Sequence, residues 1–495
     1  MEPAEDASFR GAKGDSRSDS GAPAGRLTLL DTTSIIVGII IGSTIFKMSP
    51  TISGSAASFA CYAYREFGAE HLRLMTPGEE YWVQIAGIAT IWIAGGLIAL
   101  MGALCYAELG TALPQEGGSY VYLKEAFGRP TAFGFAWTEF WIVRPGNVGA
   151  IAFVAATFAL QLLPTSFQAW LGPRPETAVA LLFIIGLTVI NLLGIQMERW
   201  TQNLLTAAKV LGLVIVGALA WFWLTATPGT NAVPPPTGTS LSFAMIMVMF
   251  AYGGWSDMSN VAAEVIEPRR NISRALLLGT GSVLTIYLLL NLGFAKGLGL
   301  AGLYGSSNVA SDVLQRSWGP IGDKLVSLLV TVSCLGAIHG MLFTGARVYY
   351  KLGSEHPLFR WLGVWHPQLD VPLRSLLAQT VVTVALVAMF GASAAAFDRL
   401  VMFTGPFYWG FICLVVVALA VLRWQHRLAE NRYRVPLYPL PPLLFSAACI
   451  WMAYSGILFA WSSGGREGYW ALAVVVVGLL ILAVDFVLLR KPARS

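Results

Sequence analysis

The feature that most constrains this chain is a pair of apolar segments that small residues interrupt in the middle. Gly42, Ser43 and Thr44 interrupt the first apolar segment, and Gly253 and Gly254 interrupt the sixth. Inside a bilayer, unwound backbone persists only where its N–H and C=O groups line a cavity or bind a ligand. Broken helices at matching positions in two halves of a membrane protein therefore predict a small-molecule site at the midplane.

Composition places the chain among multi-pass membrane proteins. Its 495 residues are 56% apolar and 12% charged, whereas soluble domains carry about 25% charged residues. At roughly 20 residues for each crossing, we predict an all-α integral membrane protein with about twelve spans. The expected spans are Leu27–Met48, Ile85–Tyr106, Thr131–Leu162, Ala178–Ile195, Gln202–Ala226, Leu241–Glu264, Ala275–Ala295, Ile321–Tyr350, Leu373–Phe390, Phe397–Leu422, Pro442–Trp461 and Tyr469–Leu489.

Lys and Arg gather in alternate connections between these spans, which predicts that both termini of this cell-membrane protein lie in the cytoplasm. The residues concerned are Lys124, Arg129, Arg199, Arg269, Arg270, Arg274, Arg347, Lys351, Arg360, Arg423, Arg427, Arg432 and Arg434. Met1–Arg26 has no apolar signal-peptide core, and we predict a disordered cytoplasmic tail there. The outer connection Thr51–Gln84 holds several aromatic and charged residues. A short amphipathic helix over the outer mouth and a floppy insertion explain it equally well.

The first break favours binding of a carboxylate. Gly38 and Gly42 form a GxxxG pattern, which alone would indicate close helix packing. Ser43 and Thr44 can satisfy their own backbone and so ease unwinding. The outer half-helix would begin near Thr44, and its first N–H groups would face an anion.

The second break favours binding of an ammonium group. Phe250, Ala251, Tyr252 and Gly253 would end the first half-helix with free carbonyl groups at its negative dipole end. Phe250 could close over a bound molecule, while Ser256 and Asp257 follow within the same span. A glycine kink packed against a neighbouring helix is the alternative.

Three further polar side chains lie inside apolar spans. Lys209 is about two turns inside the fifth span, so a functional role with a partner is preferred to snorkelling. For Arg144, structural pairing and a transport role are equal alternatives. His339 could titrate near neutral pH, although a hydrogen-bonded neutral histidine explains it as well.

Motifs of other functional classes are missing from the sequence. The five cysteines show no metal-binding spacing, and there is no catalytic or nucleotide-binding signature. No basic run with interleaved aromatics suits nucleic acid. We therefore expect no enzymatic activity, no cofactor, no metal and no nucleic-acid partner; the partners are the lipid bilayer and a small molecule.

Several stretches together resemble the amino acid–polyamine–organocation transporter superfamily, and within it the L-type amino acid transporter family and its bacterial relatives. The stretches are Gly38–Phe46, Gly102–Gly128, Trp137–Pro145 and Phe250–Ala275. The resemblance implies a LeuT-like inverted repeat of five plus five helices within a transporter domain, residues 27–490, that works by alternating access. Its parts would be a first repeat, 27–226, with an outer insertion, 51–84; a second repeat, 241–422; and two accessory helices, 442–489. Lys209 matches the lysine that replaces a sodium ion, and Phe250 matches the gating aromatic.

Some positions depart from the family pattern. Thr44 stands where the family usually has Gly, Ser256 stands where Asn is frequent, and His339 stands where a small polar residue is usual. No cysteine follows the third span on the outer side, so we expect no disulfide-linked heavy subunit. The resemblance implies a sodium-independent transporter or exchanger of amino acids, neutral ones by our hypothesis.

We assign the hypothetical roles as follows: Gly42, Ser43 and Thr44 hold the carboxylate, and Ala251, Tyr252 and Gly253 hold the amine. Asp257, His339 and Ser256 tune side-chain choice, and the first two could carry a proton. Two rivals stay open. Asp257 could instead favour a cationic amino acid or a polyamine, or the protein could be an amino-acid sensor that does not transport.

Overall fold

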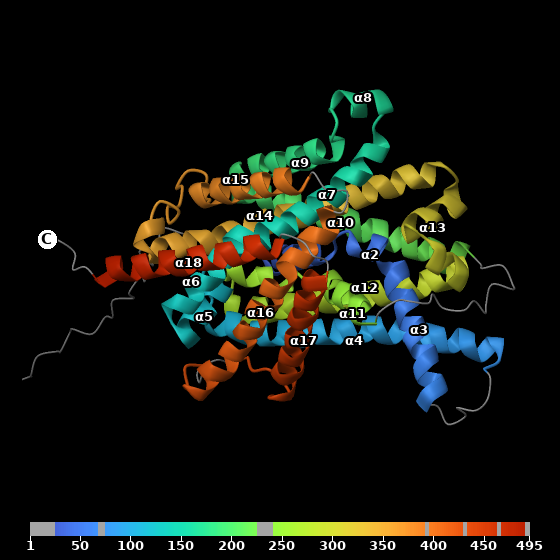
Figure 1. The fold of residues 1–495 in the computed structure, drawn as a ribbon, viewed down its shortest axis with the longest axis horizontal. Helices are drawn as coiled ribbons and strands as arrows, with labels where there is room; N and C mark the ends of the chain where they lie inside the picture. Colours follow the sequence, from blue (N-terminus) through green and yellow to red (C-terminus); the bar gives the residue numbers. More distant parts are fainter. Residues whose placement is uncertain are drawn as a thin grey trace, which may run out of the picture.

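The computed structural model describes residues 25–67, 75–224, 241–391, 396–428, 433–462 and 467–490 (Figure 1). Within these residues every regular element is a helix, apart from isolated bridges between Leu27 and Val265 and between His366 and Val371. The predicted tail Met1–Arg26 lies outside the described residues except for its last two positions. The helices are α1 (Leu29–Ile40), α2 (Thr44–Lys47), α3 (Ser49–Phe67), α4 (Pro77–Ala112), α5 (Ser119–Phe127), α6 (Arg129–Thr138), η1 (Glu139–Val143), α7 (Arg144–Leu162), α8 (Thr165–Trp170), α9 (Pro175–Leu192), α10 (Ile195–Ala218), η2 (Leu219–Trp223), α11 (Leu241–Ala251), η3 (Trp255–Glu264), α12 (Pro268–Gly305), α13 (Val309–Trp318), α14 (Ile321–Glu355), η4 (Pro357–Phe359), α15 (Leu373–Phe390), α16 (Ala396–Trp424), α17 (Leu440–Ser462) and α18 (Glu467–Arg490).

In the described part of the chain, nine helical stretches are long and apolar enough to cross a membrane on their own. Two of the other three expected spans are short for a local reason. The first and sixth segments are broken, so their first halves, α1 and α11, have only 12 and 11 residues. The last expected span lies in α18, which has 24 residues. The all-helical, multi-pass class predicted from the sequence is confirmed.

Several helices extend beyond the predicted spans because capping residues, and not the apolar pattern, set their ends. Helix α4 begins at Pro77, eight residues before the predicted Ile85. Thr76 accepts a hydrogen bond from the Glu79 N–H, and the Glu79 carboxylate accepts one from Thr76, which forms a capping box. Hydropathy detects only the part of a helix that lies in lipid, so it misses such polar turns.

The outer connection Thr51–Gln84 is largely helical, so the floppy alternative is wrong for its described residues. Helix α3 occupies most of it up to Phe67, and α4 begins within it. The first half of α3 is buried, for example at Ile52 and Ala56, whereas Phe59 is 48% exposed. Residues 68–74 of this connection lie outside the described part, and the predicted position over the outer mouth stays a prediction.

The two broken segments lie inside the bundle. Helix α1 packs against α10, α12 and α14, and α11 packs against α3 and α4. On the other side of the breaks, α7 packs against α14, α15 and α16. Figure 1 shows most of the long helices running along the longest axis of the molecule, with α5 and α6 near one end and α3 and α13 near the other. The breaks therefore lie within the packed bundle, surrounded by other helices.

Candidate substrate site

The first break is an unwound segment of three residues between α1 and α2. Helix α1 ends at Ile40, Ile41 leaves helical geometry with ψ 89°, and helix resumes at Thr44. The Gly42 N–H donates to the Ile40 carbonyl over 2.9 Å, a bond too local to continue the helix. The Ile52 N–H donates a hydrogen bond to the Met48 carbonyl, so α2 continues almost directly into α3. The predicted discontinuity of the first segment is confirmed.

The carbonyl groups at this break are already occupied. Lys209 is fully buried, and its ammonium group donates to the Gly38 carbonyl at 2.7 Å, the Ile41 carbonyl at 2.9 Å and the Ser333 carbonyl at 2.7 Å. The Ser333 hydroxyl donates to Ile41 over 3.0 Å and approaches the Gly42 carbonyl at 3.4 Å. The N–H groups at the start of the outer half-helix have no partner within a helix. The break therefore offers donors, and not acceptors, to a ligand.

The second break separates α11 from η3. Gly253 N–H donates to the Phe250 carbonyl over 3.1 Å, and Gly254 has φ +107°. A non-glycine residue rarely adopts this φ, which explains the glycine. Beyond it, Trp255–Glu264 is a 3-10 helix and not the α-helix expected of a span. The break in the sixth segment is confirmed, and the tighter winding of η3 changes which side chains face the cavity.

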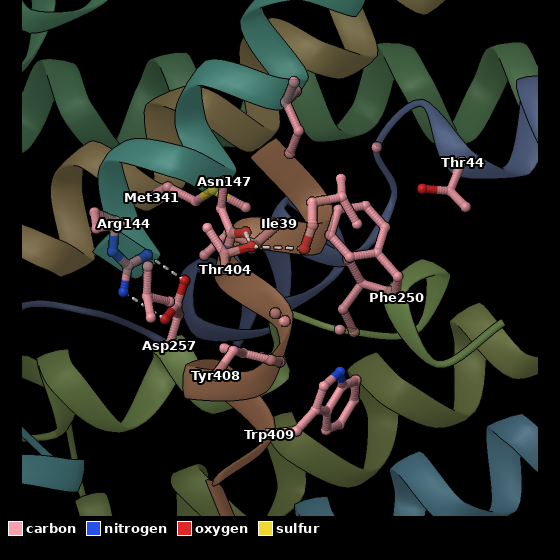
Figure 2. A pocket seen from close by; sticks show the side chains of 18 of the residues that line it. Ile39, Thr44, Arg144, Asn147, Phe250, Asp257, Met341, Thr404, Tyr408 and Trp409 are labelled. Carbon is pink, nitrogen blue, oxygen red and sulfur yellow. Dashed lines mark hydrogen bonds and ion pairs between the residues drawn. The ribbon is translucent and has the colours of Figure 1, made fainter. Parts of the chain in front are cut away.

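A cavity of about 70 Å³ lies between the two breaks and the α7, α14 and α16 helices (Figure 2). Its wall includes the predicted site residues Gly42, Ser43, Thr44, Phe250, Gly253 and Asp257. Figure 2 shows Phe250 and Thr44 on one side and Arg144, Asn147 and Thr404 on another. The structure thus brings both breaks to one chamber, as the sequence predicted.

Other predicted residues do not line this chamber. Tyr252 is fully buried, and its hydroxyl donates to the Trp92 carbonyl over 3.0 Å, so its ring faces α4. Ala251 precedes it in the last turn of α11 and is also outside the cavity wall, while Ser256 lines a second, smaller cavity beside the first. The binding roles of Ala251, Tyr252 and Ser256 stay predictions.

His339 lies behind the first break and not in the chamber. Its side chain is 1% exposed, and its Nδ1 lies 3.0 Å from Gln202 Oε1. It lines a small polar cavity with Asp31, Glu198 and Asn203. This placement fits the hydrogen-bonded alternative; its predicted role in selectivity stays untested.

Three ionisable residues in the chamber wall, Glu139, Arg144 and Asp257, contact one another, and the sequence analysis did not connect them. Arg144 and Asp257 form a bidentate pair, with Nη1–Oδ2 and Nη2–Oδ1 distances of 2.7 and 2.8 Å (Figure 2). Arg144 Nη2 also lies 2.6 Å from Glu139 Oε1. As whole residues, all three are less than a tenth exposed. Charged residues inside spans usually pair with one another. This principle could have indicated that Arg144 pairs with an acid.

A π-helical turn places Glu139 and Arg144 together. Residues Glu139–Val143 form η1, and Pro145 follows Arg144 at the start of α7. Proline has no N–H to continue the α-helical ladder, which favours a bulge of this kind. The π turn is a deviation from α-helical geometry, and such turns occur frequently at functional sites.

Asn147 and Thr404 are polar wall residues that the sequence analysis missed. The Thr404 hydroxyl lies 2.9 Å from Asn147 Oδ1 and also 3.1 Å from the Val401 carbonyl. The half-buried Asn147 amide is shown beside the cavity in Figure 2. Met341 and Val401 complete this wall, which therefore mixes apolar area with a few polar groups, as small-molecule sites do.

Broken membrane helices around a chamber of mixed polarity are typical of secondary transporters. The chain matches the amino acid permease family over residues 27–482, and it belongs to that family. The activity of this family is amino acid transport, and not catalysis, so the resemblance stated from the sequence is confirmed.

Named relatives agree with this family. The chain is 28% identical over 475 residues to the rabbit large neutral amino acids transporter small subunit 2, covering 94% of this chain and 81% of the relative. It is 28% identical over 435 residues to the human cystine/glutamate transporter, covering 86% and 79%. It is 27% identical over 428 residues to the mouse b(0,+)-type amino acid transporter 1, covering 84% and 80%.

Proposed function

We propose that this protein transports neutral amino acids across the cell membrane by alternating access, without sodium, and that exchange is its mode. The main support is that the carbonyl groups of the first break already accept hydrogen bonds from within the protein, whereas the N–H groups at the start of the outer half-helix have no partner within a helix. Lys209 and Ser333 engage its carbonyls, so the groups left for a ligand are N–H donors. Such donors suit a carboxylate, which every amino acid carries.

The amine would lie against the second break, across the chamber. The end of α11 carries the negative end of the helix dipole, and Gly253 lines the chamber beside Phe250. Phe250 is half-buried and its ring packs against Phe397 with centroids 6.4 Å apart. In this proposal the substrate side chain faces Asn147, Met341 and Thr404.

The geometry favours neutral over cationic substrates. Asp257 was the residue that could have selected a cationic side chain or a polyamine. Both of its carboxylate oxygens accept hydrogen bonds from Arg144, so a cation would have to compete with a guanidinium for them. A buried bidentate pair is costly to open.

Sodium independence rests on the Lys209 ammonium group, which fills the space between three carbonyls. A bound sodium ion would need the same oxygens. We further propose that both termini are cytoplasmic, that residues 27–226 and 241–422 are the two inverted repeats, and that no heavy subunit is attached by a disulfide. The connection between α7 and α9 contains no cysteine, and the five cysteines of the chain are free.

The experiment is uptake of labelled leucine into proteoliposomes preloaded with amino acids. We expect uptake to require internal amino acid, to persist when choline replaces sodium, and to be inhibited by neutral amino acids but not by arginine or putrescine. Gly253→Leu should abolish uptake, because even a Cβ there lies 3.2 Å from the Phe250 carbonyl and the rest of the side chain enters the chamber. Gly281→Leu is the matched control, since Gly281 has open space around it.

Three results would contradict the proposal. Inhibition by arginine or putrescine would favour the cationic alternative. Intact binding in a thermal-shift assay with zero flux would favour the sensor. Normal uptake by Gly253→Leu would mean that the substrate does not occupy this chamber.

A further inference from the structure

A second buried guanidinium group lies away from the substrate chamber and holds two carboxyl groups at once. Arg347 of α14 is 1% exposed, and its Nε lies 2.8 Å from Glu264 Oε1 at the end of η3. Its Nη2 lies 3.4 Å from Glu198 Oε2 near the start of α10. Glu198 is 1% exposed and Glu264 is fully buried. One positive charge thus faces two buried acids from different segments.

The two carboxyl groups lie at the same edge of the guanidinium. The Nε and Nη2 atoms form the edge that commonly donates two parallel hydrogen bonds to one carboxylate. Arg423 shows this common arrangement, since its Nε and Nη2 donate to Glu108 Oε1 and Oε2 over 2.7 and 2.5 Å. At Arg347 two acids share the edge, so their charges would lie side by side if both were ionised.

The other oxygen of each acid lacks a hydrogen-bond donor. Glu198 Oε1 and Glu264 Oε2 are buried and have no partner among the described residues. The third Arg347 nitrogen, Nη1, donates to the Phe343 carbonyl over 2.8 Å. Both oxygens are buried so completely that a water molecule does not fit against them. An ionised carboxylate oxygen in such a position is unfavourable.

Another buried acceptor without a donor lies beside Glu198. His339 of α14 is 1% exposed and lines a small cavity together with Glu198. Its Nδ1 lies 3.0 Å from Gln202 Oε1, which can only accept, so a neutral ring carries its proton on Nδ1. The His339 Nε2 atom is then an acceptor, and it has no partner in the described part of the chain. His339 therefore cannot donate to Glu198, and both groups lack a donor.

The other charged groups around the two acids do not neutralise them. Arg199 of α10 pairs with Asp31 of α1 at 3.0 Å. Lys351 of α14 pairs with Glu355 at 3.3 Å. Glu116, from the connection between α4 and α5, is a further acid nearby. The two nearby cations thus pair with other acids, and the surplus of negative charge stays with the pair on Arg347.

We propose that Glu198 and Glu264 form a proton-binding site and share one proton in this conformation. Two adjacent carboxylates in a buried site are costly to ionise together, and one proton removes a negative charge and supplies the missing donor. No group of three or more His, Cys, Asp or Glu side chains in the described residues could hold a metal ion, and a proton needs no additional space. Neither acid lines the substrate chamber, so this inference does not depend on the proposed function.

The shared proton connects two segments that also shape the breaks. Glu198 lies on α10, the helix that carries Lys209, and Glu264 ends η3, which follows the second break. A hydrogen bond between the acids would replace repulsion between these segments. A conformation that separates α10 from η3 would let both acids ionise and would release the proton.

Infrared spectroscopy tests the site directly, because a protonated carboxyl group has a carbonyl band separate from that of a carboxylate. Full-length protein is measured at pH 7 in a maltoside detergent, which contains no carbonyl group. The acid-unfolded protein, in which the 27 Asp and Glu side chains and the C-terminal carboxyl are protonated, gives the band area for each group. We expect Glu198→Gln to lose the area of one carboxyl group. Glu264→Gln should lose the same area, because the remaining acid then has Arg347 to itself.

Glu108→Gln is the matched control, because Glu108 is a 1% exposed glutamate that has the edge of Arg423 to itself. It should leave the band unchanged. A full band in folded Glu198→Gln protein would overturn the proposal, and so would a loss in Glu198→Gln without one in Glu264→Gln. An equal loss in Glu108→Gln would overturn it too, because burial alone would then explain the proton. Zero leucine uptake by the parent, together with the expected band losses, would contradict the proposed function and leave the proton site supported.

Discussion

The sharpest test of the paired breaks is a single added methyl group at Gly254. This residue has φ +107°, and a Cβ there would lie 2.5 Å from Ile39 Cγ2 and 3.3 Å from the Ile39 carbonyl carbon. Ile39 lies in the last turn of α1, directly before the first break. Gly254→Ala therefore presses one break against the other.

Two costs add at this position. A left-handed conformation costs an L-residue about 1–2 kcal/mol. The contact at 2.5 Å is about 1 Å shorter than an ordinary carbon–carbon contact, and overpacking of this kind costs about 1–3 kcal/mol. We expect a total near 3 kcal/mol. Because unwound backbone has few hydrogen bonds to restrain it, the breaks would move apart, and substrate affinity would fall about a hundredfold.

The assay is a double-mutant cycle read by calorimetric binding of leucine and by thermal unfolding. Ile39→Ala removes the Cγ2 atom, so Gly254→Ala should cost about 1–2 kcal/mol less in that background, while the strain of the backbone remains. Gly281→Ala, a helical glycine with open space, is the control and should be neutral or slightly stabilising. If Gly254→Ala binds leucine within threefold of the parent and melts at the same temperature, the contact between the breaks does not define the site.

Two further substitutions test the buried charges. Lys209→Met keeps most of the volume but leaves three carbonyls without a charged donor, each bond contributing about 1.5–3 kcal/mol; we expect a lower melting temperature and loss of nearly all flux, whereas the exposed Lys296→Met should resemble the parent. Normal flux in Lys209→Met would refute this role. Asp257→Asn breaks the pair with Arg144 and should destabilise the protein by about 3–5 kcal/mol in chemical denaturation. The exposed Glu267→Gln, whose pair with Arg270 spans 3.9 Å, should cost less than about 1 kcal/mol, and equal effects of the two changes would contradict the argument.

The sequence predicted the breaks because the residues there act locally. Glycines and small hydroxyl residues permit unwinding wherever they stand, so Gly42–Thr44 and Gly253–Gly254 marked both discontinuities correctly. Hydropathy predicted the centres of the long spans correctly, because it too depends only on neighbouring residues. Hydropathy did not predict the helix ends, because features such as the capping box at Thr76 and Glu79 extend α4 beyond its apolar part.

Local patterns could not predict the direction in which individual side chains point. An α-helix places successive residues about 100° apart, but a 3-10 helix places them about 120° apart. Residues Trp255–Glu264 adopt the tighter winding, which puts Asp257 in the chamber wall and Ser256 in the neighbouring cavity. Tyr252 turns toward Trp92 because its hydroxyl finds a carbonyl there.

Charge pairing was the larger omission, and it has a physical cause. Asp257 and Arg144 are 113 positions apart, so only tertiary packing brings them together. Each stood out as an expensive residue in an apolar span, but the sequence alone does not say which partner offsets that cost. Once paired, Asp257 no longer offers a free charge, and the hypothesis of a cationic substrate loses its main support.

In the proposed site, Lys209 illustrates how residues outside the chamber wall can set which backbone groups a substrate would meet. An unwound segment carries both N–H and C=O groups, and by itself it could bind a cation as well as an anion. The buried ammonium group and the Ser333 hydroxyl engage the carbonyls from behind, which leaves the donors facing the chamber. If a neutral side chain replaced Lys209, these carbonyls would be available to a metal ion or to water. Added sodium should then stabilise Lys209→Met but not the parent protein, and the absence of such an effect would mean that the ammonium group does not stand in for a cation.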